Sequence, residues 1–454
     1  MPRLLSLLCL CASLLLGACH VQDADAPAQA PSVAPLPAPP AWLGPLEARY
    51  DTQLRVAGLE DRAFPPERWW DIATPLLEPA RGFTTESLGQ SVEGRPLRLV
   101  RWGQGGKLVL LWSQMHGDES TASMALADLF RFLGEHPDDP LVQRLRRQTT
   151  LHVFPIVNPD GAARFIRNNA QGIDLNRDAR RLATPEARVL HALRAQVRPD
   201  FAFNLHDQRV GYRAGDSDRG VAIALLAPAF NAARDVDAAR GRAIEVAVAI
   251  RAALEPAIGG HIARWDDTFN PRGFGDTSAK SGASTVLIEA GGLPDDPQKQ
   301  RLRKLYFIAL VAGLDAIATG AHAGMPRARY EELPQNGRVW PDLRIDNATL
   351  ALPGQPTARA DVLVNFEQPL LERGGSIAEI GDLAGTPARR SIDATGLYIV
   401  PISVPGARPR AVAPHAPAYF QLSRDPAGND VVWTLARDVD PAQPSPETIR
   451  NTSD

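Results

Sequence analysis

Short, largely apolar runs alternate with longer amphipathic segments between residues 44 and 325. Such runs are typical of strands that are buried on both faces of a sheet. The expected strands are 97–102, 107–112, 150–156, 200–205, 222–226 and 285–288, and the expected helices are 121–133, 185–196, 235–254 and 297–317. This alternation predicts an α/β domain with a mixed, mostly parallel sheet flanked by helices.

The pattern changes in the C-terminal part of the chain, where the helical period fades. Short β-prone stretches separated by Gly and Pro occupy 346–352, 360–366, 396–402, 419–422 and 431–435. They predict a small all-β, sandwich-like domain over residues 338–438. The polar segment 439–454 is expected to be a disordered tail.

The N-terminus has the pattern of a secretory signal peptide over residues 1–19, with Arg3 followed by an apolar stretch that ends in small residues. The sequence Leu-Gly-Ala-Cys at 16–19 also resembles the lipobox of bacterial lipoproteins. That resemblance implies a lipid on Cys19 and a periplasm-facing anchor in the cell envelope. His20 in place of Asp favours the outer membrane. A plain signal peptide or an uncleaved anchor is the alternative interpretation.

Residues 20–43 are rich in Pro and Ala and are expected to form an extended linker. The three cysteines all lie within the first 19 residues, so a metal in the body of the protein must be held by His, Asp or Glu. The formal net charge of −3 gives no basis for nucleic-acid binding.

Four motifs place polar side chains just after, or at the end of, an apolar run. They are Gln-Met-His-Gly-Asp-Glu-Ser at 114–120, Asn-Pro-Asp-Gly at 158–161 with Gly-Ile-Asp-Leu-Asn-Arg at 172–177, Asn-Leu-His-Asp at 204–207, and Thr-Val-Leu-Ile-Glu-Ala-Gly-Gly at 285–292. Ligands of α/β sheets collect at the carboxyl ends of strands. His116, His206 and Glu289 are therefore expected at one edge of the sheet.

Each motif is weak when it is taken alone. His116 and Glu119 have a spacing that suits two ligands of one metal, but such a pair is more often an ordinary surface pair. A single His at a strand end is usually structural. Glu289 is more unusual, because an unpaired carboxylate at the end of a buried strand is costly.

Taken together and in this order, the motifs resemble the zinc carboxypeptidase family, the carboxypeptidase A-like metallopeptidases. The segment Leu-Gly-Gln-Ser-Val-Glu-Gly-Arg-Pro at 88–96 is similar to the family as well, and the resemblance extends over about 81–314. It implies one zinc ion per chain with water in the open position. The implied ligands are His116, Glu119 and His206.

The same resemblance implies the catalytic and binding residues. Glu289 would be the general base, and Arg167 would stabilise the oxyanion. Asn176 and Arg177 would bind the free carboxylate of the substrate.

Two features depart from the family, and a third position concerns its specificity pocket. Asp178 follows Arg177, and an acid there is expected to disfavour an anionic substrate or to favour one that carries an amine. Residues 264–273 contain no counterpart of the mobile tyrosine of the family, although Trp265 or Phe269 could line the pocket. Gly275, before Asp276, is expected to leave a roomy pocket without a charge of its own.

The leading interpretation is a metallocarboxypeptidase that hydrolyses C-terminal peptide bonds of peptides in the cell envelope. An amidase that cleaves peptidoglycan stem peptides, an N-acyl amino acid deacylase and a non-catalytic envelope binding protein are the alternatives. The retained Glu289 argues against the binding protein. A serine hydrolase is unsupported because the chain has no Gly-x-Ser-x-Gly elbow.

Overall fold

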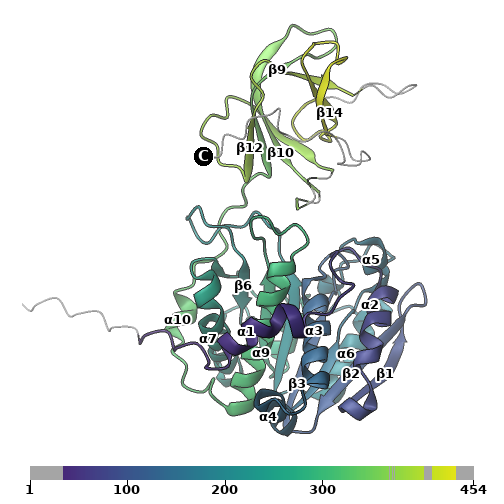
Figure 1. The fold of residues 1–454 in the computed structure, drawn as a ribbon, viewed down its shortest axis with the longest axis vertical. Helices are drawn as coiled ribbons and strands as arrows, with labels where there is room; N and C mark the ends of the chain where they lie inside the picture. Colours follow the sequence, from purple (N-terminus) through teal and green to yellow (C-terminus); the bar gives the residue numbers. More distant parts are fainter. Residues whose placement is uncertain (1–33, 368, 371, 373, 403–411, 436–454) are drawn as a thin grey trace, which may run out of the picture. The chain divides into compact units, whose positions relative to one another are not determined.

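The computed structural model describes residues 34–367, 369–370, 372, 374–402 and 412–435 (Figure 1). The expected signal peptide, Cys19 and the expected disordered tail lie outside these residues. Among the described helices, none is both long and apolar enough to cross a bilayer.

The first part of the chain forms a mixed sheet with the strand order β1-β2-β4-β3-β5-β8-β6-β7. These strands are β1 (Phe83–Gln90), β2 (Pro96–Gly103), β3 (Lys107–Ser113), β4 (Thr149–Phe154), β5 (Phe201–Asp207), β6 (Ile223–Leu226), β7 (Ile262–Arg264) and β8 (Ser284–Ala290). The central strands β4, β3, β5 and β8 run parallel, and β1 and β2 pair antiparallel with their neighbours. At the other end of the sheet, β6 pairs antiparallel with β8 and parallel with β7. The predicted α/β class is therefore confirmed.

Helices cover both faces of this sheet (Figure 1). They are α1 (Leu43–Arg49), α2 (Pro66–Ala73), α3 (Thr121–Glu135), α4 (Pro140–Gln148), α5 (Pro159–Arg164), α6 (Pro185–Val197), α7 (Ala238–Ile258), α8 (Phe274–Lys280), α9 (Gln300–Thr319) and α10 (Ala328–Glu331). Short turns of other helix types are η1 (Tyr50–Leu54), η2 (Thr74–Leu76), η3 (Pro79–Arg81) and η4 (Leu175–Arg177).

Alternate side chains of the central strands enter two separate cores. In β3, Val109 and Leu111 join the larger cluster, which includes α3, α7 and α9. Leu110 and Trp112 join the smaller cluster on the other face, which includes α6. Successive side chains of a strand point to opposite faces, so a strand covered on both sides must be apolar throughout. This explains why the runs of the sequence show no alternation.

The C-terminal part forms a second, mostly antiparallel sheet, which confirms the predicted β domain. Its strands are β9 (Leu343–Leu350), β10 (Ala358–Asn365), β11 (Ser376–Gly381), β12 (Arg390–Asp393), β13 (Tyr398–Pro401), β14 (Phe420–Ser423) and β15 (Val431–Leu435). One edge of β9 pairs with β10, and its other edge pairs in parallel with β12 and then with β13. The left-handed residue Asn347, at φ 62°, lies between these two pairings.

Candidate metal centre

The three parallel strands β3, β5 and β8 bring the site residues to one edge of the first sheet. His116 and Glu119 lie in the turn between β3 and α3. His206 and Glu289 lie near the ends of β5 and β8 and are directly opposed in the register of the two strands. Because β3, β5 and β8 are adjacent parallel strands, His116, His206 and Glu289 meet at one edge of the sheet, as the sequence predicted.

The turn that carries His116 and Glu119 depends on two glycines. A Cβ on Gly117 would lie 2.0 Å from the carbonyl carbon of Gly161, so only glycine allows the turn to approach the start of α5 this closely. The side chain of Asn158 accepts from the Gly161 N–H at 2.9 Å and donates to the Met115 carbonyl at 3.3 Å. The Asn-Pro-Asp-Gly motif therefore supports the metal-ligand turn.

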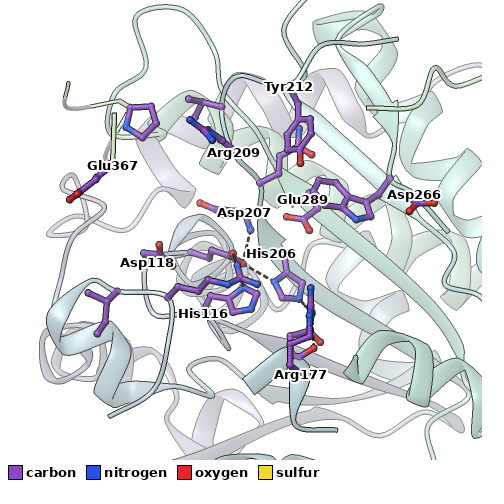
Figure 2. Close-up of a pocket in the computed structure, with 18 of the residues that line it drawn as sticks. His116, Asp118, Arg177, His206, Asp207, Arg209, Tyr212, Asp266, Glu289 and Glu367 are labelled. Carbon is purple, nitrogen blue, oxygen red and sulfur yellow. Dashed lines mark hydrogen bonds and ion pairs between the residues drawn. The ribbon is translucent and has the colours of Figure 1, made fainter. Parts of the chain in front are cut away.

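His116, Glu119 and His206 form a compact buried cluster whose candidate ligand atoms all lie within 4.8 Å of one another. The Nδ1 atom of His116 lies 2.6 Å from Glu119 Oε1, and the Nδ1 atom of His206 lies 2.7 Å from Glu119 Oε2 (Figure 2). Two imidazoles and one carboxylate are a donor set that zinc takes in catalytic sites. The donor set and the convergence of its atoms fit a zinc ion held by these three residues.

Asp174 orients the first imidazole. Its Oδ1 lies 3.1 Å from His116 Nε2, which leaves His116 Nδ1 for the metal. Its Oδ2 accepts from Arg167 Nη2 at 2.9 Å, and Arg167 Nη1 donates to Glu119 Oε1 at 3.3 Å. Burial raises the pKa of the Asp174 carboxyl, but His116 and Arg167 outweigh burial and hold it well below its usual range.

Glu289 faces the same cavity without a partner. The residue is only 7 % exposed, its Oε2 is fully buried, and neither carboxylate oxygen has a hydrogen-bond partner among the described residues. Burial, and then the carboxylates of Glu119 and Asp207, raise the pKa of Glu289 well above its ordinary value. A carboxyl in this state is available to a water or a ligand in the cavity.

Asn176 and Arg177 lie in η4 and line the cavity beside His206. The Asn176 side chain is fixed, because its Oδ1 accepts from the Phe274 N–H at 2.9 Å, and its Nδ2 lies 3.4 Å from His206 Nε2. The Arg177 side chain is exposed to the cavity, and among the described residues it donates only to the Asn176 carbonyl, at 2.8 Å. Its guanidinium is therefore available to an anionic group.

The expectations for Asp178 and Gly275 are corrected by the structure. Asp178 is engaged away from the carboxylate-binding pair, because its carboxylate accepts from the N–H groups of Ala183 and Thr184 and from the Thr184 hydroxyl, each at 2.9 Å. Gly275 does not open the pocket, since a Cβ there would lie 3.0 Å from Asn204 Nδ2.

The pocket also has a charge of its own. Asp276 lines the cavity and accepts from the Asn270 N–H at 2.7 Å. Burial raises the pKa of the Asp276 carboxyl to about 6, so this group is at least partly ionised at neutral pH. Asp276 therefore gives the cavity an acidic group next to Gly275 in the sequence.

A tyrosine reaches the site from a segment that the sequence did not single out. Tyr212, between β5 and β6, lines the cavity, and its ring packs edge-on against Trp265 with centroids 5.3 Å apart. Burial, and then the nearby Glu289 carboxylate, raise the pKa of its phenol. Trp265 and Phe269 line the cavity as expected. A phenol is present although residues 264–273 contain none, and no local pattern around Tyr212 could have indicated it.

Zinc binding is expected to release a proton from His116. In the metal-free protein, burial lowers the pKa of this imidazole, but the Glu119 and Asp174 carboxylates raise it to about 9, whereas burial leaves the pKa of His206 below its usual value. A metal ligand must be unprotonated. Zinc affinity should therefore rise with pH up to about 9 and level off above it, with roughly one proton released per zinc at pH 7.

Calorimetry of zinc binding to the metal-free protein, in buffers of different ionisation enthalpy, measures the number of protons released. An affinity that is independent of pH between 7 and 9 would contradict this assignment of the imidazole charge.

Residues 80–194 match the family model described as zinc carboxypeptidase. The chain is similar to an uncharacterized protein of Zymomonas mobilis, ZMO1242 (28 % identity over 30 % of this chain and 36 % of that protein), and to carboxypeptidase SOL1 of Arabidopsis thaliana (30 % identity, 23 % and 27 %). The match to carboxypeptidase E of Caenorhabditis elegans is 32 % identical over 21 % of this chain and 25 % of that protein. The chain thus spans about a third or less of these curated relatives.

Solved structures show a more distant likeness. A metallo-carboxypeptidase of Burkholderia cenocepacia aligns with a TM-score of 0.44 at 20 % identity and covers 57 % of this chain and 71 % of that one. Carboxypeptidase A of Helicoverpa armigera aligns with a TM-score of 0.47 at 16 % identity and covers 62 % and 82 %.

Proposed function

We propose that this chain, whose residues 80–194 match the zinc carboxypeptidase family model, is a zinc-dependent metallocarboxypeptidase that hydrolyses C-terminal peptide bonds. One observation carries the proposal. The unpartnered, buried carboxyl of Glu289 faces a cavity that it shares with the buried cluster of two imidazoles and one carboxylate. That is the arrangement that hydrolysis of an amide by an activated water requires.

Each of the proposed catalytic and binding residues has a separate role in the reaction. Zinc, when bound, supplies Lewis acidity toward the scissile carbonyl and an attacking water. Glu289 accepts the proton of that water and passes it to the leaving amine. Arg167, held by Asp174, contributes positive charge where the oxyanion develops. Asn176 and Arg177 hold the free carboxylate and so select the last peptide bond.

The test is release of C-terminal amino acids from a mixed peptide library by the detergent-purified full chain, with and without a zinc chelator. Release that the chelator abolishes and added zinc restores supports the proposal. If purified peptidoglycan stem peptides are cleaved and ordinary peptides are not, the amidase replaces the carboxypeptidase. If the zinc-loaded protein cleaves neither kind of peptide, the N-acyl amino acid deacylase and the non-catalytic binding protein remain.

Arg177→Ala should raise KM for peptides with a free C-terminus by about 10- to 100-fold, because a charge-assisted hydrogen bond to the carboxylate is lost. Steady-state kinetics on matched peptides with a free or an amidated C-terminus measure the effect. For the amidated peptide, kcat/KM of Arg177→Ala should stay close to that of the wild type.

The control for this variant is Arg180→Ala, since Arg180 is an exposed arginine close by in the sequence that does not line the cavity. An equal loss of kcat/KM for the free and the amidated peptide in Arg177→Ala would contradict a role in carboxylate binding.

The lipid anchor on Cys19 and the location in the cell envelope, facing the periplasm, belong to the same proposal. The lipobox-like sequence at 16–19 and the Pro- and Ala-rich linker that follows it support them. Metabolic labelling with a fatty-acid analogue in bacterial cells should label the wild-type chain but not Cys19→Ser. Unlabelled wild-type protein in the soluble periplasmic fraction would contradict the anchor. Separation of inner from outer membranes then decides which membrane holds it.

A further inference from the structure

A buried ion pair beside the site has no part in the proposed reaction. Lys299 Nζ donates to Asp207 Oδ2 at 2.9 Å, and the two side chains are only 1 % and 3 % exposed. Withdrawing two charges from water is costly, and a hydrophobic pair of similar volume would often serve stability as well or better. We therefore looked for a function of the Lys299–Asp207 pair other than stabilisation of the fold.

Asp207 is connected to the metal ligands by its backbone and by its side chain. It directly follows His206, and its backbone N–H donates to Glu119 Oε2 at 3.1 Å. Its Oδ2 also accepts from the Thr121 hydroxyl at 2.6 Å, at the first residue of α3, two positions after Glu119. The same residue therefore fixes both chain segments that supply zinc ligands.

Lys299 extends this connection to the strand that carries the proposed base. Its Nζ donates a second hydrogen bond, at 3.2 Å, to the carbonyl of Ala290, the residue after Glu289. Its backbone has a left-handed conformation, with φ 53°, directly before α9. Non-glycine residues adopt this conformation rarely. The fold thus accepts an unfavourable backbone conformation where the ammonium group is buried between β5 and β8.

These contacts join three segments that are far apart in the sequence: the β3–α3 turn with His116 and Glu119, the end of β5 with His206, and the end of β8 with Glu289. A metal site needs its ligands held within a few tenths of an ångström, and groups that orient the ligands affect affinity strongly. The contacts of Asp207, Lys299 and Thr121 supply that kind of restraint.

We propose that Asp207, Lys299 and Thr121 form a positioning unit that sets the zinc ligands and Glu289 relative to one another. The inference rests on the proposed function for its effect on catalysis, but its effect on zinc affinity does not require that any peptide be cleaved. None of the three residues is assigned contact with the reacting atoms; they act through His206, Glu119 and Glu289.

The test compares Lys299→Met with Arg303→Met in the full chain. Arg303 forms an equally buried ion pair with Asp128, in a pair of helices rather than at the strand ends. Both variants should unfold at a lower temperature than the wild type. Only Lys299→Met should bind zinc more weakly, by about 10- to 100-fold, in competition with a chromophoric chelator. For cleaved peptides its kcat should fall while KM stays close to that of the wild type, because Arg177 is untouched.

Thr121→Val provides the second measurement and decides the matter if Lys299→Met does not fold. It leaves the ion pair intact and removes only the hydroxyl that links α3 to Asp207. Weaker zinc binding by this variant, with a thermal midpoint near that of the wild type, supports the positioning unit. Zinc affinities equal to the wild type in every folded variant overturn it. If the wild type binds zinc but cleaves no peptide, the proposed function fails and the zinc measurements still test the positioning unit.

Discussion

Glu289→Gln should reduce kcat for peptide hydrolysis by on the order of 10²- to 10⁴-fold, the range expected when a positioned general base is removed. The amide has nearly the shape of the carboxyl but cannot accept and return the proton of a water. Glu289 has no hydrogen-bond partner among the described residues, so the substitution breaks no described contact. Steady-state kinetics on the most rapidly cleaved peptide measure the effect.

Zinc content and thermal stability of Glu289→Gln should match the wild type, because Glu289 is not among the three proposed ligands. Glu245→Gln is the matched control, since Glu245 is another buried glutamate of the same domain and pairs with Arg327 instead. A Glu289→Gln enzyme that retains more than a tenth of the wild-type kcat would exclude Glu289 as the base.

Arg303→Met should lower the free energy of unfolding by about 3–5 kcal/mol, because it leaves the carboxylate of Asp128 buried without its charged partner. Both side chains are fully buried, and the guanidinium makes two hydrogen bonds to the carboxylate at 2.6 and 2.7 Å. It also donates to the carbonyls of Val56 and Leu59 and so fastens the N-terminal segment to α9. Urea-induced unfolding, followed by tryptophan fluorescence, measures the loss.

The double variant Asp128→Leu with Arg303→Met is the control for this prediction. It removes both charges, so it should be more stable than Arg303→Met alone, although Tyr50 and Val56 then lose their acceptor on Asp128. If the double variant is as unstable as the sum of the two single variants, the two side chains do not act as a pair.

The two buried ion pairs illustrate how one fold uses the same interaction differently. Arg303 and Asp128 join α9 to α3 beside the larger hydrophobic core, where we expect the pair to affect stability alone. Lys299 and Asp207 lie at the strand ends and line the cavity. A charge that is buried next to a metal site can hold the ligands in place. Its burial lowers the stability of the fold, and the packing of the surrounding hydrophobic core offsets that loss.

The sequence by itself indicated the central strands, the long helices and the candidate metal ligands, but not β1, β7, β11, β12 or the shorter helices such as α4. A strand buried on both faces has to be apolar along its whole length, and the expected strand 107–112 agrees with β3 at Lys107–Ser113. His116, Glu119 and His206 were implied as ligands by the resemblance of the ordered motifs to the zinc carboxypeptidase family. The turn with His116 and Glu119 also needs a glycine at position 117. These constraints act between residues that are neighbours in the sequence, so the sequence alone shows them.

Only the tertiary structure decided which side chains surround the metal ligands. Lys299 and Asp207 are 92 positions apart, and Tyr212 and Trp265 come from separate segments. Asp178, which lies beside Arg177 in the sequence, bonds to the start of α6 instead. Such contacts follow from the order of the strands and the packing of their connections. No periodicity along the chain encodes them, because each depends on two segments that meet only after the sheet has formed.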